Sequence, residues 1–264
     1  MTQRLGLLMI AGMLLLPLPV LAIDRFEIQV YDSDINDPGH FGLELHANYT
    51  PLGLREGDYP GQIPPHGAFR TTLEPAIGVT EWLEVAGYLQ MLVAPDVGAQ
   101  WGGAKIRAKF VVPAKKKLPL HLGLNVEVGA VPHSMEASGW ANEFRPIVAW
   151  TNGVWWIGFN PIFGYALTGP DAFKPELEPC GKVAWNTQRG FQLGAEYYSG
   201  LGLIPEGFSP LSAQEHLVFL TFDLASPKDA ETENPWELNV GVGHGLTSGT
   251  SATWEVKTIV GRGF

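Results

Sequence analysis

Leu-Pro-Leu-His-Leu-Gly-Leu-Asn-Val-Glu-Val, residues 118–128, is the stretch of sequence that decides the fold. Its apolar residues occupy every second position, and the residues between them from His121 onward are polar or glycine. Successive side chains of a β-strand point to opposite faces, so this alternation predicts a strand with one apolar and one polar face. The same pattern recurs in Phe41–Thr50 and Ala104–Phe110. The sequence therefore predicts an all-β, antiparallel protein.

Continued along the chain, the alternation predicts twelve strands that are separated by Gly, Pro, Asn and Asp. We place them at 39–50, 67–79, 82–94, 101–112, 117–129, 142–151, 154–167, 173–186, 190–199, 214–225, 235–246 and 252–264. Long and short connections alternate, 226–234 being the one long exception among the short ones, and Asn152-Gly153 is predicted to be a two-residue hairpin turn. An even strand count with such connections is typical of a transmembrane β-barrel, which we predict for residues 39–264.

Composition agrees with a membrane barrel and excludes several other classes. Charged residues make up 17% of the chain, against about 25% in typical soluble proteins. The chain has 32 glycines and nine tryptophans, and glycine is frequent on the polar face of the predicted strands, where a soluble sandwich would carry many charges. A formal charge of −10 argues against nucleic acid as a partner. A single cysteine, Cys180, excludes a disulfide scaffold.

Both ends of the chain indicate the outer membrane of a Gram-negative cell. Residues 1–22 are predicted to be a signal peptide: Arg4 precedes an apolar run, and Val20-Leu21-Ala22 forms a cleavage site that leaves Ile23 as the new N-terminus. The alternative is an uncleaved membrane anchor. The final strand ends in Phe264, which resembles the signal recognised by the outer-membrane assembly machinery. Lipids of that membrane and its assembly machinery are therefore the expected partners.

Residues 23–38 stand apart from the predicted barrel. Arg25–Tyr31 alternates, but a thirteenth strand would reverse the order of long and short connections, so we expect a short strand or a periplasmic segment. Asp32, Asp34 and Asp37 are then spaced like the opening of a calcium-binding loop. Asp37 occupies the position of the loop glycine, and Leu43 that of the bidentate glutamate. An Asx-rich turn is the alternative interpretation.

The polar face of the strands is predicted to line the lumen. The charged residues expected there are Arg70, Glu74, Glu84, Lys105, Arg107, Lys109, Glu127, Glu143, Arg145, Lys182 and Glu196. Buried charges must be paired or hydrated, so the lumen holds either an ion-pair network or a wet passage. Three cations, Lys105, Arg107 and Lys109, share one face of one strand. They either guide anionic or polar solutes or form a structural network with Glu84 and Glu127.

Several hairpin motifs resemble those of a known group of proteins. They are Leu73-Glu74-Pro75, Gly78-Val79-Thr80-Glu81-Trp82-Leu83-Glu84, Arg145-Pro146-Ile147, Trp150-Thr151-Asn152-Gly153 and Asn160-Pro161. In these motifs, the chain resembles proteobacterial outer-membrane barrels of the phenol meta-cleavage-pathway transporter family, over most of residues 26–264. The resemblance implies a barrel and, loosely, uptake of small organic or aromatic compounds. It transfers no functional residue.

We therefore predict a channel for passive passage of small solutes, without catalysis, cofactor or metal. A structural or adhesive barrel with a plugged lumen is the main alternative, with loops 51–66, 130–141 and 200–213 as its working surface. A lipid-modifying enzyme would need Ser, His and an acidic or amide residue together. His133-Ser134 and His244 with Ser248 are candidates, but neither has a third member at a recognisable spacing.

Overall fold

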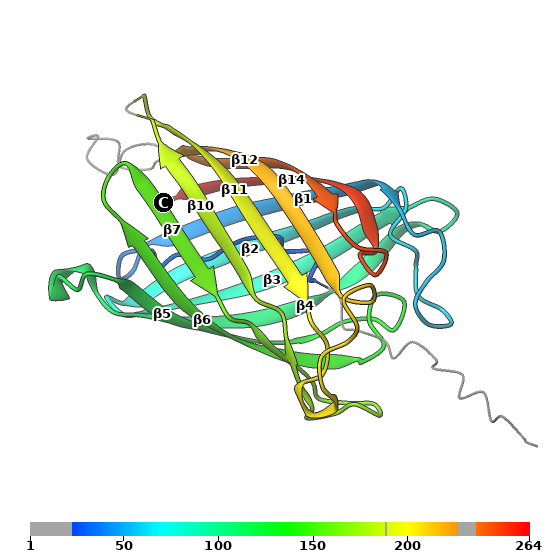
Figure 1. Ribbon diagram of the computed structural model, residues 1–264. Coiled ribbons are helices and arrows are strands. Elements are labelled where there is room, and N and C mark those ends of the chain that lie inside the picture. Colours follow the sequence, from blue (N-terminus) through cyan, green and yellow to red (C-terminus); the bar gives the residue numbers. More distant parts are fainter. Residues whose placement is uncertain (1–22, 188, 226–235) are drawn as a thin grey trace, which may run out of the picture.

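The computed structural model describes residues 23–187, 189–225 and 236–264. Figure 1 shows tilted strands that wind into a cylinder, and every strand pair is antiparallel. The strands are β1 (Phe41–Gly53), β2 (Phe69–Thr80), β3 (Leu83–Ala94), β4 (Gly98–Val111), β5 (His121–Ala130), β6 (Trp140–Thr151), β7 (Trp155–Asn160), β8 (Phe163–Ala166), β9 (Pro175–Leu177), β10 (Cys180–Asn186), β11 (Phe191–Gly200), β12 (Glu215–Ala225), β13 (Trp236–Gly245) and β14 (Ala252–Gly263). Pairing of β1 with β14 and of β5 with β6 closes the sheet.

Two of the wall strands are interrupted, so these segments make twelve spanning strands and confirm the predicted barrel. β7 and β8 form one spanning strand, because both pair with β6. The break falls at Pro161, which has no backbone N–H to donate to the ladder. β9 and β10 form another, broken at Glu178-Pro179. The uninterrupted strands predicted over 154–167 and 173–186 are corrected in this respect.

Two turns differ from the sequence-based prediction. β5 begins at His121 and not at residue 117, because a short 3₁₀ turn, η1 (Ala114–Lys116), is followed by Lys117 at φ +51° and by Pro119. The hairpin between β6 and β7 turns at Gly153 and Val154, one residue later than predicted. Gly153 supplies the positive φ, and the Asn152 side chain accepts hydrogen bonds from the backbone N–H groups of Val154 and Trp155.

The outer surface of the barrel is apolar. Leu45, Leu89 and Ile106 are exposed on it, and so are most of the tryptophans. Arg262 is the outward cation near the C-terminus, and its guanidinium lies 5.0 Å from the ring centre of Trp236. Such a surface matches the hydrocarbon core of a bilayer.

None of the described residues belongs to a helix long and apolar enough to cross a membrane.

Residues 23–38 lie inside the barrel, which corrects the expectation of a short strand or a periplasmic segment. We call residues 23–38 the N-terminal segment. It forms no ladder with the wall, and Ile23, Ile28 and Tyr31 are buried. A closed sheet has no free edge with which an extended segment can pair. The predicted signal peptide at 1–22 and the connection predicted at 226–234 lie outside the described residues.

Candidate functional site: the barrel lumen

Every charged residue predicted to line the lumen points inward in the structure. The least buried of these side chains, Glu143, is only 13% exposed. The structure brings them together in three groups: around Arg107 on β4, around Lys105 and Glu127, and around Lys182 and Glu196 on β10 and β11. Arg70 stands apart from these groups, where it donates to Thr50 at 3.2 Å and lies over the Phe26 ring. The alternation of side chains along each strand was therefore enough to predict which residues face the lumen.

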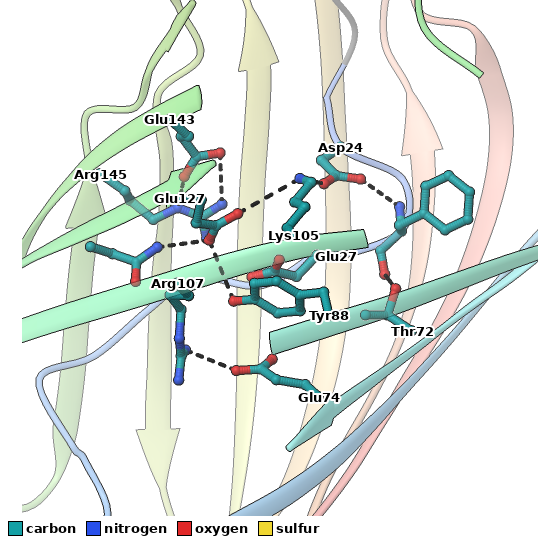
Figure 2. A network of polar contacts seen from close by, with 12 residues as sticks. Asp24, Glu27, Thr72, Glu74, Tyr88, Lys105, Arg107, Glu127, Glu143 and Arg145 are labelled. Carbon is teal, nitrogen blue, oxygen red and sulfur yellow. Dashed lines mark hydrogen bonds and ion pairs between the residues drawn. The ribbon is translucent and has the colours of Figure 1, made fainter. Parts of the chain in front are cut away.

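Arg107 is the centre of the first group. Its guanidinium forms an ion pair with Glu74 at 3.0 Å and another with Glu84. It also lies 5.5 Å from the ring centre of Tyr31, which belongs to the N-terminal segment. Figure 2 shows Arg107 and Glu74 below Tyr88, on the inner side of the wall. Neighbouring strands thus supply two acids to one cation, and all three charges are buried.

The two lysines beside Arg107 are paired mainly by the N-terminal segment. Lys105 forms an ion pair with Asp24 and lies 3.7 Å from Glu127 (Figure 2). Lys109 donates to the backbone carbonyl oxygen of Asp34 at 2.7 Å and lies 3.7 Å from the Asp32 carboxylate. The stripe of three cations is therefore compensated, as the structural interpretation of the sequence expected. Glu84 and Glu127 were predicted as partners, whereas the contribution of the N-terminal segment was missed.

The remaining pairs lie in two parts of the wall, on β10 to β14 and on β6 beside β5. Lys182 bridges Glu196 at 3.1 Å and Asp223 at 2.7 Å. Lys257 on β14 also contacts Glu196 and is completely buried. Arg145 on β6 donates to Glu143 two residues earlier at 2.6 Å (Figure 2). Its guanidinium lies 4.3 Å from the ring centre of Tyr31.

Side chains of the wall satisfy the backbone of the N-terminal segment. Acceptor carbonyls along it are those of Arg25 (from Asn48, 2.9 Å), Phe26 (from Thr72, 3.0 Å), Ile28 (from Lys257, 3.0 Å), Gln29 (from Arg145, 3.2 Å) and Tyr31 (from Asn160, 3.1 Å). Buried backbone groups need partners, and here donors from many strands replace a β-ladder. The lumen charges therefore hold a plug in place as well as pairing with one another.

Both ends of the N-terminal segment are fixed. One end lies at the mouth of the barrel that carries the long loops, which we call the loop end. There Arg25 forms ion pairs with Glu215 at 3.1 Å and Glu255 at 3.3 Å. At the opposite end, the backbone and side-chain nitrogens of Asn36 both donate to Glu84 at 2.7 Å. The backbone there passes so close to Gly78 that a Cβ atom on this glycine would lie 2.2 Å from the Asn36 carbonyl oxygen. Gly78 therefore provides clearance for the plug.

The acidic residues spaced like a calcium-binding loop form a turn in the structure. Asp32 accepts the backbone N–H of Asp34 at 2.9 Å, which is an Asx turn. Among the described residues, the converging group of possible ligands is instead Glu44, His46 and Glu74. His46 lies 3.3 Å from Glu74, which Arg107 also contacts. These ion pairs already compensate the carboxylates of the group.

The candidate catalytic pairs are occupied by other contacts. The carbonyl oxygen of His133 accepts a hydrogen bond from the Tyr59 hydroxyl, and its ring packs on the Tyr59 ring. His244 faces outward against Trp254, with ring centres 4.6 Å apart. Ser248 donates to the Ser212 carbonyl oxygen at 2.9 Å. Neither pair presents the hydrogen-bonded nucleophile and base that hydrolysis requires.

A cavity of about 210 Å³ occupies the loop end of the lumen, above the start of the N-terminal segment. Phe26, Ile63 and Met135 supply apolar surface. Carboxylates exceed cations among its lining residues, with Asp24, Asp58, Glu127, Glu136, Glu143, Asp171 and Glu178 against Arg25, Arg70 and Lys105. Burial raises the pKa of Glu136 to about 7, although Lys105 acts in the opposite direction. The alternation of residues along the strands could not predict this cavity, because loops and the N-terminal segment form much of its wall.

The fold and the lumen define a class of protein: a transmembrane β-barrel of the outer-membrane type, with an apolar outer surface and a charged interior that its own N-terminal segment fills. No protein-family model and no curated protein sequence matches the chain.

Comparison with solved structures agrees with this class. The chain is similar to the crystal structure of the COG4313 outer membrane channel from Pseudomonas putida F1, with 10% sequence identity and a TM-score of 0.54 over 90% of this chain and all of that one. It is also similar to the KdgM porin, with 10% identity and a TM-score of 0.48 over 84% of this chain and 98% of that one. At such low identity the likeness shows the fold alone.

Proposed function

We propose that the chain is an outer-membrane channel for the passive passage of small solutes. The observation that carries this proposal is the unfilled cavity at the loop end, whose lining is charged and drawn from wall, loops and N-terminal segment. A barrel with a purely structural role needs no such space, whereas a solute channel needs one between its wall and its plug. Insertion by the outer-membrane assembly machinery, through the strand that ends in Phe264, belongs to the same proposal.

The lining of the cavity favours small organic cations over anions. Its excess of carboxylates attracts positive charge, as acidic rings do in cation channels. Phe26, Ile63 and Met135 can contact the apolar body of a solute. A cavity of about 150 Å³ accommodates benzene, so the 210 Å³ available here admits a solute with one ring and a small polar group.

The N-terminal segment closes the lumen below this cavity. A second space of about 20 Å³, lined by Glu27, Gln29 and Arg145, continues beside it and is large enough for about one water molecule. Passage of a solute therefore requires the N-terminal segment to move. The same plug favours the second candidate function, a structural or adhesive barrel with a closed lumen.

Recording of currents across planar bilayers distinguishes the two functions. We expect the processed protein to conduct weakly and a variant that lacks residues 23–35 to conduct several-fold more, because the plug no longer fills the lumen. The matched control is Lys115→Ala, at an exposed turn far from the lumen lining. Absence of current from both well-folded proteins would reject the channel and favour the structural barrel.

Ion selectivity tests the proposed preference for cations. With a pKa of about 7, Glu136 is neutral at lower pH and charged at higher pH, facing Lys105 and Asp24 in the cavity. The ratio of cation to anion permeability should therefore rise as the pH increases through 7. In Glu136→Gln that rise should be lost. A ratio that favours anions in the wild type would contradict the preference.

A further inference from the structure

The backbone nitrogen of Ile23 contacts a buried carboxylate. It donates to Glu215 Oε2 at 3.0 Å, and both residues are less than 10% exposed. Glu215 lies at the start of β12, and its other oxygen accepts from Arg25 at 3.1 Å and from the backbone N–H of Ser251 at 2.9 Å. Three donors thus converge on one buried carboxylate.

Glu215 shares its arginine partner with a second buried carboxylate, Glu255, which Arg70 also approaches through the Thr50 hydroxyl. Arg25 forms ion pairs with both Glu215 and Glu255, so one guanidinium serves two buried carboxylates among the described residues. Glu255 is completely buried, and its Oε1 atom lacks a hydrogen-bond partner within this part of the chain. A positive charge on the Ile23 nitrogen would give Glu215 a cationic partner that it does not share with Glu255.

Removal of the predicted signal peptide would place that charge on Ile23. Cleavage between Ala22 and Ile23 converts an amide nitrogen into an α-amino group, which is protonated at neutral pH. We propose that the α-ammonium of mature Ile23 forms a buried ion pair with Glu215 and thereby fastens the free end of the N-terminal segment inside the lumen. Its remaining protons face the cavity, whose lining includes Ile23.

The ion pair gives proteolytic processing a structural consequence. In an unprocessed chain the same nitrogen is a neutral amide, which donates a weaker hydrogen bond than a charged group does. Signal removal would then stabilise the plugged state of the barrel in addition to releasing the chain. This inference depends on cleavage before Ile23 and is independent of whether solutes pass through the lumen.

Labelling of the N-terminal amine tests the proposal on the processed, full-length barrel. An amine-reactive reagent used near neutral pH selects α-amines over lysines, because the α-amine has the lower pKa. Mass spectrometry of the terminal peptide identifies the first residue and measures how fast it is modified. We expect Ile23 as the first residue and a labelling rate in the folded barrel at least about tenfold below that in the unfolded chain, as a buried, charge-assisted hydrogen bond implies.

Two isosteric variants separate this ion pair from general destabilisation. Glu215→Gln should raise the labelling rate of folded barrels about tenfold, because it removes the carboxylate that holds the amine. Glu255→Gln is the matched control: this residue is equally buried and also contacts Arg25, but it does not contact the Ile23 nitrogen. Its rate should change less than about twofold. The heat-sensitive electrophoretic mobility of barrels restricts each measurement to folded molecules.

Three results would each overturn the proposal. They are a mature chain that starts at another residue, an α-amine that reacts equally fast in folded and unfolded wild type, and equal responses of the two variants. Because labelling does not measure current, these results are distinct from a failure of the channel function.

Discussion

The two surfaces of the barrel wall meet at adjacent residues of β4. Ile106 is 64% exposed on the outer surface, whereas Arg107 is 6% exposed on the inner one. The outer residue needs only an apolar environment, which any position in a bilayer core supplies. The inner residue needs Glu74, Glu84 and the Tyr31 ring at defined distances. The outer surface is therefore specified by pattern and the inner surface by individual partners.

The largest effect is expected on the inner surface. Arg107→Met leaves Glu74 and Glu84 buried without their shared guanidinium, and breaking a buried ion pair in this way costs about 3 to 5 kcal/mol. Denaturant unfolding of the barrel in lipid vesicles measures this loss. The triple variant Arg107→Met, Glu74→Gln, Glu84→Gln should regain at least half of it. A loss below about 1 kcal/mol would show that the lumen is hydrated enough to solvate the two acids.

A smaller effect is expected one residue earlier. Ile106→Arg places a charge on the lipid-facing surface, at a cost of about 2 to 4 kcal/mol near the midplane of the bilayer. The same vesicle assay applies, with Ile106→Leu as a control of equal size and no charge. Equal stability of the arginine and leucine variants would show that this position does not face lipid. It would contradict the proposed difference between the outer and inner surfaces.

The smallest effect is expected where neither surface is involved. Lys115 and Glu81 form an ion pair at the short turns, with side chains 63% and 58% exposed. Exposed pairs of this kind contribute at most about 1 kcal/mol, so Lys115→Ala should change the unfolding free energy by less than that. Added salt should abolish the difference. A larger effect would mean that this turn contributes to barrel stability in a way that the ion pair does not explain.

The alternation of residues predicted the wall well, for a physical reason that also limits the prediction. Every strand pairs with neighbours on both sides, so its side chains keep a period of two, and parity placed Lys105 and Glu127 on the inner surface. The N-terminal segment has no such neighbours. Its partners are single side chains that lie far away in the sequence, several of them by more than 100 residues, such as Asn160 for Tyr31 and Glu215 for Ile23. A local pattern contains no information about contacts of that kind.

The interruptions of the wall were visible only in part. Pro161 and Pro179 are recognisable in the sequence as residues that cannot complete a ladder, yet the strands on both sides keep their parity and were predicted as continuous. The shift of the hairpin to Gly153 and Val154 depends on the Asn152 side chain, which caps the turn and leaves its own backbone outside the left-handed region. Turn propensities of residue pairs do not contain this side-chain contact.

Cleavage of the predicted signal peptide before Ile23 would make the plug a chain terminus and not a loop, with a consequence for the order of assembly. A loop that fills a barrel is joined to the wall at both ends. It must therefore be in place before the last pair of strands closes, or it must enter over the rim as a doubled-back segment. The N-terminal segment is joined covalently to the wall at one end only, through residues 39 and 40 before β1. With the predicted leader removed, a single extended chain could thread into a barrel whose β1–β14 seam is already closed. Closure of the barrel and filling of its lumen would then be separate events, and neither would have to wait for the other.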